Sequence, residues 1–165
     1  MYLKLIRNKA NGSAITGRLV INGRYFCNTL ERVGYQIPAL CYPVKVTMSP
    51  KFKRLLPLVC GVPLTEVKGE RLKAKGVENG KAETLASRPS PLASSPMRSG
   101  IRFHRGTKPE HSTGCILLPA DKEIELTNLL KDAQNHEEII LEVIDFRPGT
   151  ELGYNTPCPP ELQKP

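Results

Sequence analysis

Short runs in which apolar and polar residues alternate fill the first 50 positions of the chain. Alternation of this kind is typical of strands with one buried face. Turn residues separate the runs, which are Met1–Arg7, Ala14–Ile21, Arg24–Leu30 and Tyr42–Met48. The Asn22-Gly23 pair between the second and third runs favours a tight hairpin, because both of its turn positions need positive φ. The pattern predicts a sheet that begins with antiparallel strands.

The remainder of the chain has fewer but recognisable elements. Apolar runs predict two further strands, Gly114–Leu118 and Glu138–Phe146. Between them, apolar residues recur at helical spacing over Asp121–Gln134, with Asp121 as the expected N-cap. The stretch Phe52–Pro63 mixes basic, apolar and proline residues, and we expect an irregular covering segment there.

Composition divides the chain into one domain and two extensions. Residues 64–99 are rich in Lys, Glu and Gly and then in Ser and Pro, which predicts an inserted loop or flap. Residues 148–165 hold five prolines and predict an extended tail. The 15 prolines and 13 glycines argue against a helical bundle. We therefore expect residues 1–147 to form a mainly β domain, a single antiparallel β-sandwich or barrel-like fold with one helix before its last strand.

The formal net charge of +8 is concentrated at the start of the chain, because residues 1–60 hold ten Lys and Arg but one acid. Such a surface could attract nucleic acid, an envelope polymer or a membrane. No basic block is longer than Lys51–Arg54 and no nucleic-acid motif accompanies it, so a solvated face is favoured and no specific nucleic-acid partner is expected. Tryptophan is absent, which excludes a sugar cleft built on tryptophan.

Cysteine usage and apolar runs bear on the compartment. Five cysteines with no C-x-x-C pair predict neither a closed disulfide framework nor a zinc ribbon, and at least one free thiol. No apolar run approaches the roughly 18 residues that a membrane span needs. The first residues are too charged for a signal peptide, so we expect cytoplasmic synthesis, with release by lysis or secretion if the protein acts in the periplasm or outside.

The segment from His104 to Cys115 carries the candidate chemistry. In a short strand, alternation would place Arg102 and His104 on one face, with His104 pointing out of the core. A cysteine nucleophile needs an imidazole nearby and donors for the oxyanion that forms during attack on a carbonyl. Cys115, His104 and the amides of Gly114 and Cys115 could supply these groups if the two strands form a hairpin-like excursion that returns His104 beside Cys115.

Other interpretations of the same residues remain open. A cysteine that follows glycine on an apolar run is often a buried structural thiol. His111, four residues before Cys115, is a competing base. A metal site formed by His104, His111 and Cys115 lacks a fourth ligand, so neither a metal nor another cofactor is expected.

The motif H-R-G-T…S-T-G-C-I-L-L, from His104 to Leu118, resembles the signature of the L,D-transpeptidase (YkuD-type) catalytic domain, and the order of Cys motif, helix and final strand agrees. In that family the cysteine attacks a carbonyl of a peptidoglycan stem peptide and expels D-Ala, and the acyl group passes to an amine or to water. The resemblance implies Cys115 as nucleophile, His104 as base, the Arg105 carbonyl as the group that orients the imidazole, and amides near Gly114 as the oxyanion hole.

The motif departs from that family at two positions. Thr113 stands where histidine is usual, and Leu117 stands where many members have Arg or Asn. A cation for a substrate carboxylate would then come from Arg102 or Arg105, since a guanidinium binds a carboxylate in bidentate fashion. The predicted substrate-binding residues are Arg102, Ser112 and Thr113.

About two thirds of the chain also resembles a family of short bacterial and phage proteins. The shared segments are Asn22–Glu31, Ile37–Val44, Ser49–Pro57 and Gly100–Leu117. This second resemblance implies no activity. The sequence thus predicts cysteine-dependent acyl transfer on a peptidoglycan peptide, as L,D-transpeptidase, L,D-carboxypeptidase or endopeptidase. The alternative is a non-catalytic phage- or envelope-associated binding module in which Cys115 is buried.

Overall fold

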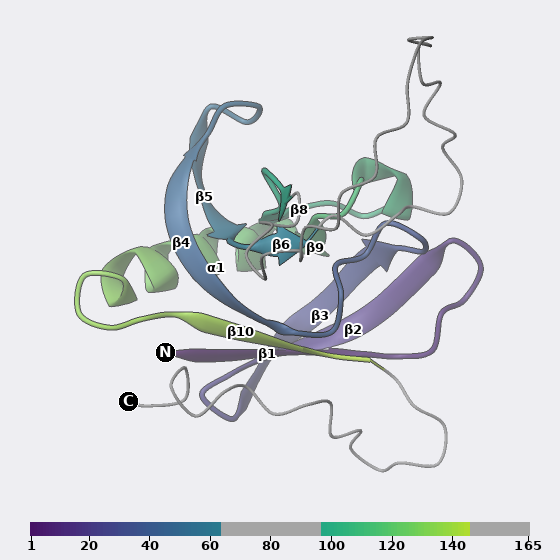
Figure 1. The fold of residues 1–165 in the computed structure, drawn as a ribbon, viewed down its shortest axis with the longest axis horizontal. Coiled ribbons are helices and arrows are strands. Elements are labelled where there is room, and N and C mark those ends of the chain that lie inside the picture. Colours follow the sequence, from purple (N-terminus) through teal and green to yellow (C-terminus); the bar gives the residue numbers. More distant parts are fainter. Residues whose placement is uncertain (64–96, 146–165) are drawn as a thin grey trace, which may run out of the picture.

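A computed structural model describes residues 1–63 and 97–145 of the chain (Figure 1). Nearly all of the predicted loop at residues 64–99 and the whole predicted tail at 148–165 lie outside the described residues. The described part contains one α-helix, α1 (Ala120–Ala133), and a short 3-10 turn, η1 (Pro109–His111). Its strands are β1 (Tyr2–Arg7), β2 (Ala14–Ile21), β3 (Arg24–Arg32), β4 (Cys41–Ser49), β5 (Arg54–Val59), β6 (Val62–Pro63), β7 (Met97–Arg98), β8 (Phe103–Arg105), β9 (Ile116–Leu118) and β10 (Ile140–Ile144).

Eight of these strands form one strongly curved sheet in the order β5-β4-β10-β1-β2-β3-β9-β8 (Figure 1). The two ends of the sheet approach each other, because the Val59 N–H donates to the Ile101 carbonyl at 2.9 Å and Leu58 forms an isolated bridge with Arg102. The sheet is therefore a nearly closed barrel. The predicted fold class, a mainly β, barrel-like domain with one helix before its last strand, is confirmed.

The early strands follow the predicted alternation closely. In the turn between β2 and β3, Asn22 and Gly23 have φ of 47° and 81°, the left-handed conformation that the hairpin requires. Most neighbouring strands are antiparallel, as expected. Two pairs are parallel instead, β1 with β10 and β8 with β9.

The irregular segment expected at Phe52–Pro63 is wrong, because β5 and β6 lie there. Strand β5 pairs with β4, and Leu56 and Val59 point into the core. Its proline, Pro57, is tolerated because β5 is the last strand in the order, where a missing N–H breaks few ladder bonds. In Figure 1, β4 and β5 arch together away from the strands formed by the first 30 residues.

Helix α1 begins one residue earlier than predicted. Pro119 is its N-cap residue. Asp121 lies in the first turn, where its carboxylate interacts favourably with the positive end of the helix dipole. Leu126 and Leu130 are fully buried against the sheet. No helix within residues 1–63 and 97–145 is both long and apolar enough to cross a membrane.

Candidate active site

Strands β8 and β9 bring the two halves of the motif together. They are parallel neighbours, with His104 opposite Leu117, so the expected hairpin-like excursion is wrong. The Ile116 N–H donates to the Arg102 carbonyl at 3.0 Å. If this register continues for one more residue, Cys115 lies beside Arg102 rather than directly beside His104. The crossover through η1 produces this offset.

The alternation of β8 and β9, continued to Cys115, would place the histidine and the cysteine on one face of the sheet, with the sulfur against the Gly100 carbonyl. Phe103 and Ile116 are paired and buried in the core, so the residues that flank them point to the opposite face. With strands about 4.8 Å apart and a rise of about 3.3 Å per residue, the Cα atoms of His104 and Cys115 are about 8 Å apart. Side chains on the same face can meet across such a distance.

The imidazole of His104 is covered by other side chains rather than open to solvent. Its side chain lies on the face opposite Phe103, yet only 4% of the residue is exposed. The ring of Phe52 packs on it with ring centroids 4.7 Å apart. Burial lowers the pKa of His104, and the positive charges of Lys51 and Arg54 act in the same direction. The imidazole is therefore neutral at neutral pH.

A backbone contact fixes which imidazole nitrogen carries the proton. Nδ1 of His104 lies 3.0 Å from the carbonyl oxygen of Arg105, and since a carbonyl can only accept, Nδ1–H is the donor. This is the contact that the family resemblance implies. The neutral ring then keeps a lone pair on Nε2, which is the arrangement a general base needs.

Both peptide groups that flank Arg105 are held in place. The Arg105 N–H donates to Oε2 of Glu123 at 3.0 Å, and the Gly106 N–H donates to the Leu118 carbonyl at 3.1 Å. Glu123 is 1% exposed and also accepts two bonds from Arg54, at 2.7 and 2.5 Å. Helix α1 thereby fixes the backbone that orients His104.

Cys115 is a free, partly exposed thiol. Its sulfur lies 3.8 Å from the Gly100 carbonyl oxygen, and no hydrogen bond joins it to His104 among the described residues. Burial raises the pKa of the Cys115 thiol, while the backbone N–H of Arg102 and the charges of Lys51, Arg98 and Arg102 lower it; burial prevails. The resting site therefore holds a neutral thiol and a neutral imidazole.

The turn before Cys115 is built by Ser112. Its buried hydroxyl donates to the Cys115 carbonyl at 2.7 Å and accepts from the Gly114 N–H at 3.0 Å. Gly114 has φ of +125°, a conformation that side chains rarely adopt. The Gly114 amide is thus occupied, whereas the Cys115 amide has no hydrogen-bond acceptor in the described part of the chain. Thr113, also predicted to bind substrate, is exposed.

Arg102 makes a set of contacts that the sequence did not suggest. Its Nη1 donates to the carbonyls of Thr47 and Leu56 at 3.0 and 2.8 Å, and its Nη2 donates to the hydroxyl of Thr47 and the carbonyl of Met48 at 3.0 and 3.2 Å. Only 6% of the residue is exposed. These bonds attach the β4–β5 hairpin to β8, and a carboxylate-binding role for Arg102 stays a prediction.

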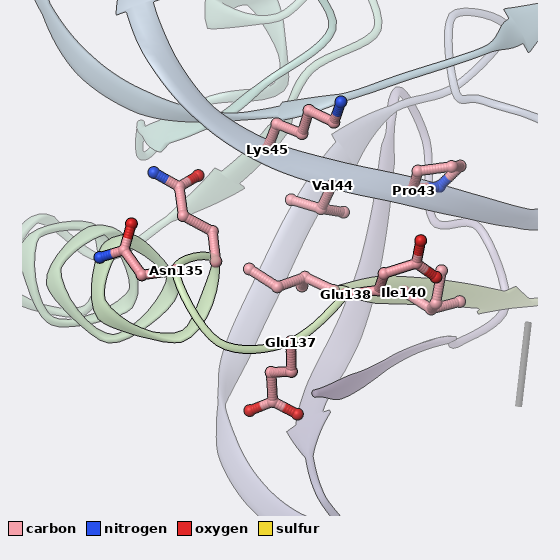
Figure 2. A pocket seen from close by; sticks show the side chains of 9 residues that line it. Pro43, Val44, Lys45, Asn135, Glu137, Glu138 and Ile140 are labelled. Atoms are coloured by element: carbon pink, nitrogen blue, oxygen red, sulfur yellow. The ribbon is translucent and has the colours of Figure 1, made fainter. Parts of the chain in front are cut away.

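The remaining candidates lie apart from this face. His111 is exposed at the end of η1. Within the described residues, no three His, Cys, Asp or Glu side chains gather as a metal site would require. A cavity of about 390 Å³ opens elsewhere, between β4, the end of α1 and the start of β10 (Figure 2), and none of the predicted site residues lines it.

Sequence reasoning missed Glu123, Lys51 and Arg98. Within α1, Glu123 is spaced so that it shares a buried helix face with Leu126 and Leu130. This spacing was the one signal in the sequence that could have identified Glu123. The other two are brought to the site by tertiary structure alone. The chain matches no protein-family model, no curated protein and no solved structure.

Proposed function

We propose that the chain is a cysteine-dependent acyl-transfer enzyme that acts on peptidoglycan stem peptides, of the L,D-transpeptidase, L,D-carboxypeptidase or endopeptidase type. One observation carries the proposal. A partly exposed thiol, Cys115, immediately precedes β9, the strand that pairs with the strand of a neutral imidazole, His104, whose Nδ1–H is held by the Arg105 carbonyl. The substrate class comes from the motif that spans both residues.

In the proposed reaction, Nε2 of His104 takes the thiol proton while the sulfur attacks the substrate carbonyl carbon. A carbon–sulfur bond forms, the carbon–nitrogen bond to the departing amine breaks, and the imidazolium returns the proton to that amine. Water or an acceptor amine then attacks the thioester, loses its proton to Nε2, and releases the thiol. Since both groups start neutral, general-base removal of the proton is required.

Two features of the site support this sequence of steps. The N–H of Cys115 is free to stabilise the oxyanion, a role that in other enzymes contributes about 10²–10³-fold to the rate. Hydrogen bonds between catalytic groups are often long before substrate binds and shorten in the complex. The gap between sulfur and imidazole in the resting state is therefore compatible with catalysis.

Purified muropeptides provide the test of this function. We expect Cys115→Ala and His104→Ala to lower the rate of stem-peptide processing, followed by mass spectrometry, by at least about 10³-fold. His111→Ala is the matched control and should retain activity, because His111 is exposed on η1. If His111→Ala were inactive and His104→Ala were active, the general base would be His111 and not His104. Absence of turnover of every stem peptide by the folded protein would refute the proposal.

One observation favours the alternative function, a non-catalytic binding module. The raised pKa of the Cys115 thiol is what a structural cysteine shows. Thiol labelling at neutral pH separates the two functions, with Cys27 as an internal reference because burial raises its pKa to about 11. A catalytic Cys115 should label much faster than Cys27, whereas a structural Cys115 should label only when the protein unfolds.

A further inference from the structure

Three cations near Cys115 have no carboxylate partner in the described residues. The ion pairs found within residues 1–63 and 97–145 involve the N-terminus and the cations Lys4, Arg7, Arg54 and Lys122. Lys51, Arg98 and Arg102 belong to none of them. Arg102 is buried and bound to carbonyls, which leaves Lys51 and Arg98 accessible to a ligand.

Arg98 packs directly on the turn that presents the cysteine. Its Nη2 donates to the Thr113 carbonyl at 2.6 Å, and its Nη1 donates to the Tyr35 carbonyl at 2.9 Å. A Cβ atom built on Gly114 would lie 2.2 Å from Nη2, so the guanidinium covers the residue next to Cys115. Two carbonyl dipoles position this cation without neutralising it, and its remaining N–H groups can bind an anion.

Lys51 reaches the same face from the other direction. It is exposed at the tip of the β4–β5 hairpin, and its Nζ lies 5.4 Å from the centroid of the Phe52 ring. That ring packs against the imidazole of His104. The ammonium group therefore lies on the imidazole side of the site, and the guanidinium of Arg98 lies on the thiol side.

We propose that Lys51 and Arg98 form an anion-binding subsite beside Cys115, which selects acyl donors that carry a carboxylate close to the reacting carbonyl. The part of this inference that concerns acyl donors rests on the proposed function. The existence of the anion-binding subsite does not depend on it. A guanidinium and an ammonium group bind a carboxylate through charge-assisted hydrogen bonds. The positive charges of both residues also lower the pKa of the Cys115 thiol, against the larger effect of burial.

Two thiol reagents of nearly equal size test the subsite without any peptide substrate. Iodoacetate carries a carboxylate, and iodoacetamide is its neutral counterpart. Both react with the same thiolate, so the ratio of their rates cancels the degree of ionisation and reports the local attraction for a carboxylate. Rates are followed at Cys115 by peptide mass spectrometry at low ionic strength, with a short synthetic peptide around Cys115 as the reference.

We expect the iodoacetate to iodoacetamide ratio at Cys115 of the folded protein to exceed that of the peptide by about tenfold, since each of the two cations should contribute about threefold through its charge. Lys51→Gln and Arg98→Gln should each lower the ratio by about threefold. Lys45→Gln, an exposed lysine on β4, should leave it unchanged. Added salt should reduce the excess.

A ratio equal to that of the peptide, or one that neither variant changes, would overturn the subsite. Failure of both reagents to modify Cys115 in the folded protein would overturn it as well, because no ligand could then reach the thiol. Neither result depends on turnover of a stem peptide. Conversely, if the protein shows an elevated iodoacetate to iodoacetamide ratio and yet processes no muropeptide, that result would support the subsite and refute only the proposed function.

Discussion

The protonation state of the His104 imidazole determines how the proposed activity varies with pH. Because burial lowers its pKa, the neutral form that accepts a proton persists to a lower pH than in a free histidine. The raised pKa of Cys115 means that the thiol keeps its proton at neutral pH. A neutral pair of this kind differs from a thiolate–imidazolium pair, in which the base is already charged at rest.

We predict that kcat/KM for stem-peptide processing increases with pH through a pKa below about 6.5 and does not fall between pH 7 and 8. A decline over that range would indicate that a protonated imidazole is required, contrary to the neutral pair. The same lowered pKa affects stability. The folded state binds fewer protons at His104 than the unfolded state, so the free energy of unfolding should decrease as pH falls below about 6.5.

Urea unfolding at several pH values measures this effect on stability. The His104 contribution should be complete above the pKa of the unfolded chain and lost as pH falls toward the lower pKa of the folded protein. His104→Gln provides the control because it removes the titrating group. If the wild type and His104→Gln lose stability equally between pH 6.5 and 5, the imidazole is not buried in its neutral form.

At the scale of elements, α1 positions the histidine through Glu123. The carboxylate of this residue joins α1 to the start of β5 through Arg54 and to β8 through the Arg105 N–H. Glu123 is thus a positioning residue, two contacts removed from the imidazole.

Glu123→Leu should lower the free energy of unfolding by about 1–3 kcal/mol, because the Arg105 N–H would lose its acceptor in a partly buried setting. It should also lower kcat more than it raises KM, since the base would be misoriented while the substrate contacts remain. Chemical denaturation and steady-state kinetics measure the two effects. The matched control is Glu125→Gln on the same helix, whose ion pair with Lys122 is exposed and should contribute less than about 1 kcal/mol.

Equal stability and kcat in Glu123→Leu and wild type would contradict the positioning role. A loss of stability without a change in kcat would mean that Glu123 has a structural role only. The pH dependence of kcat/KM adds a readout that a structural role would leave unchanged. Because Glu123 raises the pKa of His104 against the dominant effect of burial, its removal should move the acid limb of the profile to lower pH.

The elements differ in how much of them the sequence could predict. Alternation located β1 to β4 because each has one buried face and one less buried face. It failed for β5, where a proline and basic residues concealed an edge strand. The face shared by Arg102 and His104 was predictable from the spacing of two. The parallel register of β8 and β9 was not, because it depends on a crossover whose path local sequence does not encode.

At the scale of the whole molecule, the near closure of the barrel assembles the site. Arg102 attaches the β4–β5 hairpin to β8, so residues about 50 positions apart in the chain, such as Phe52 and His104, come into contact. The single acid of the first 60 residues, Glu31, is buried in an ion pair with Arg7. Among residues 1–63 and 97–145, Lys51 forms no ion pair, which agrees with a site that attracts anions.

As the proposed nucleophile, Cys115 would form a covalent thioester with a stem peptide. Intact-protein mass spectrometry of the full chain, quenched in acid soon after mixing with purified muropeptides, measures this directly. We predict a mass increase equal to the peptide without its leaving amine, located on Cys115 by peptide mapping and absent in Cys115→Ala. Stem-peptide processing that continues undiminished in Cys115→Ala, or the same adduct formed on another residue, would contradict a nucleophilic role for Cys115.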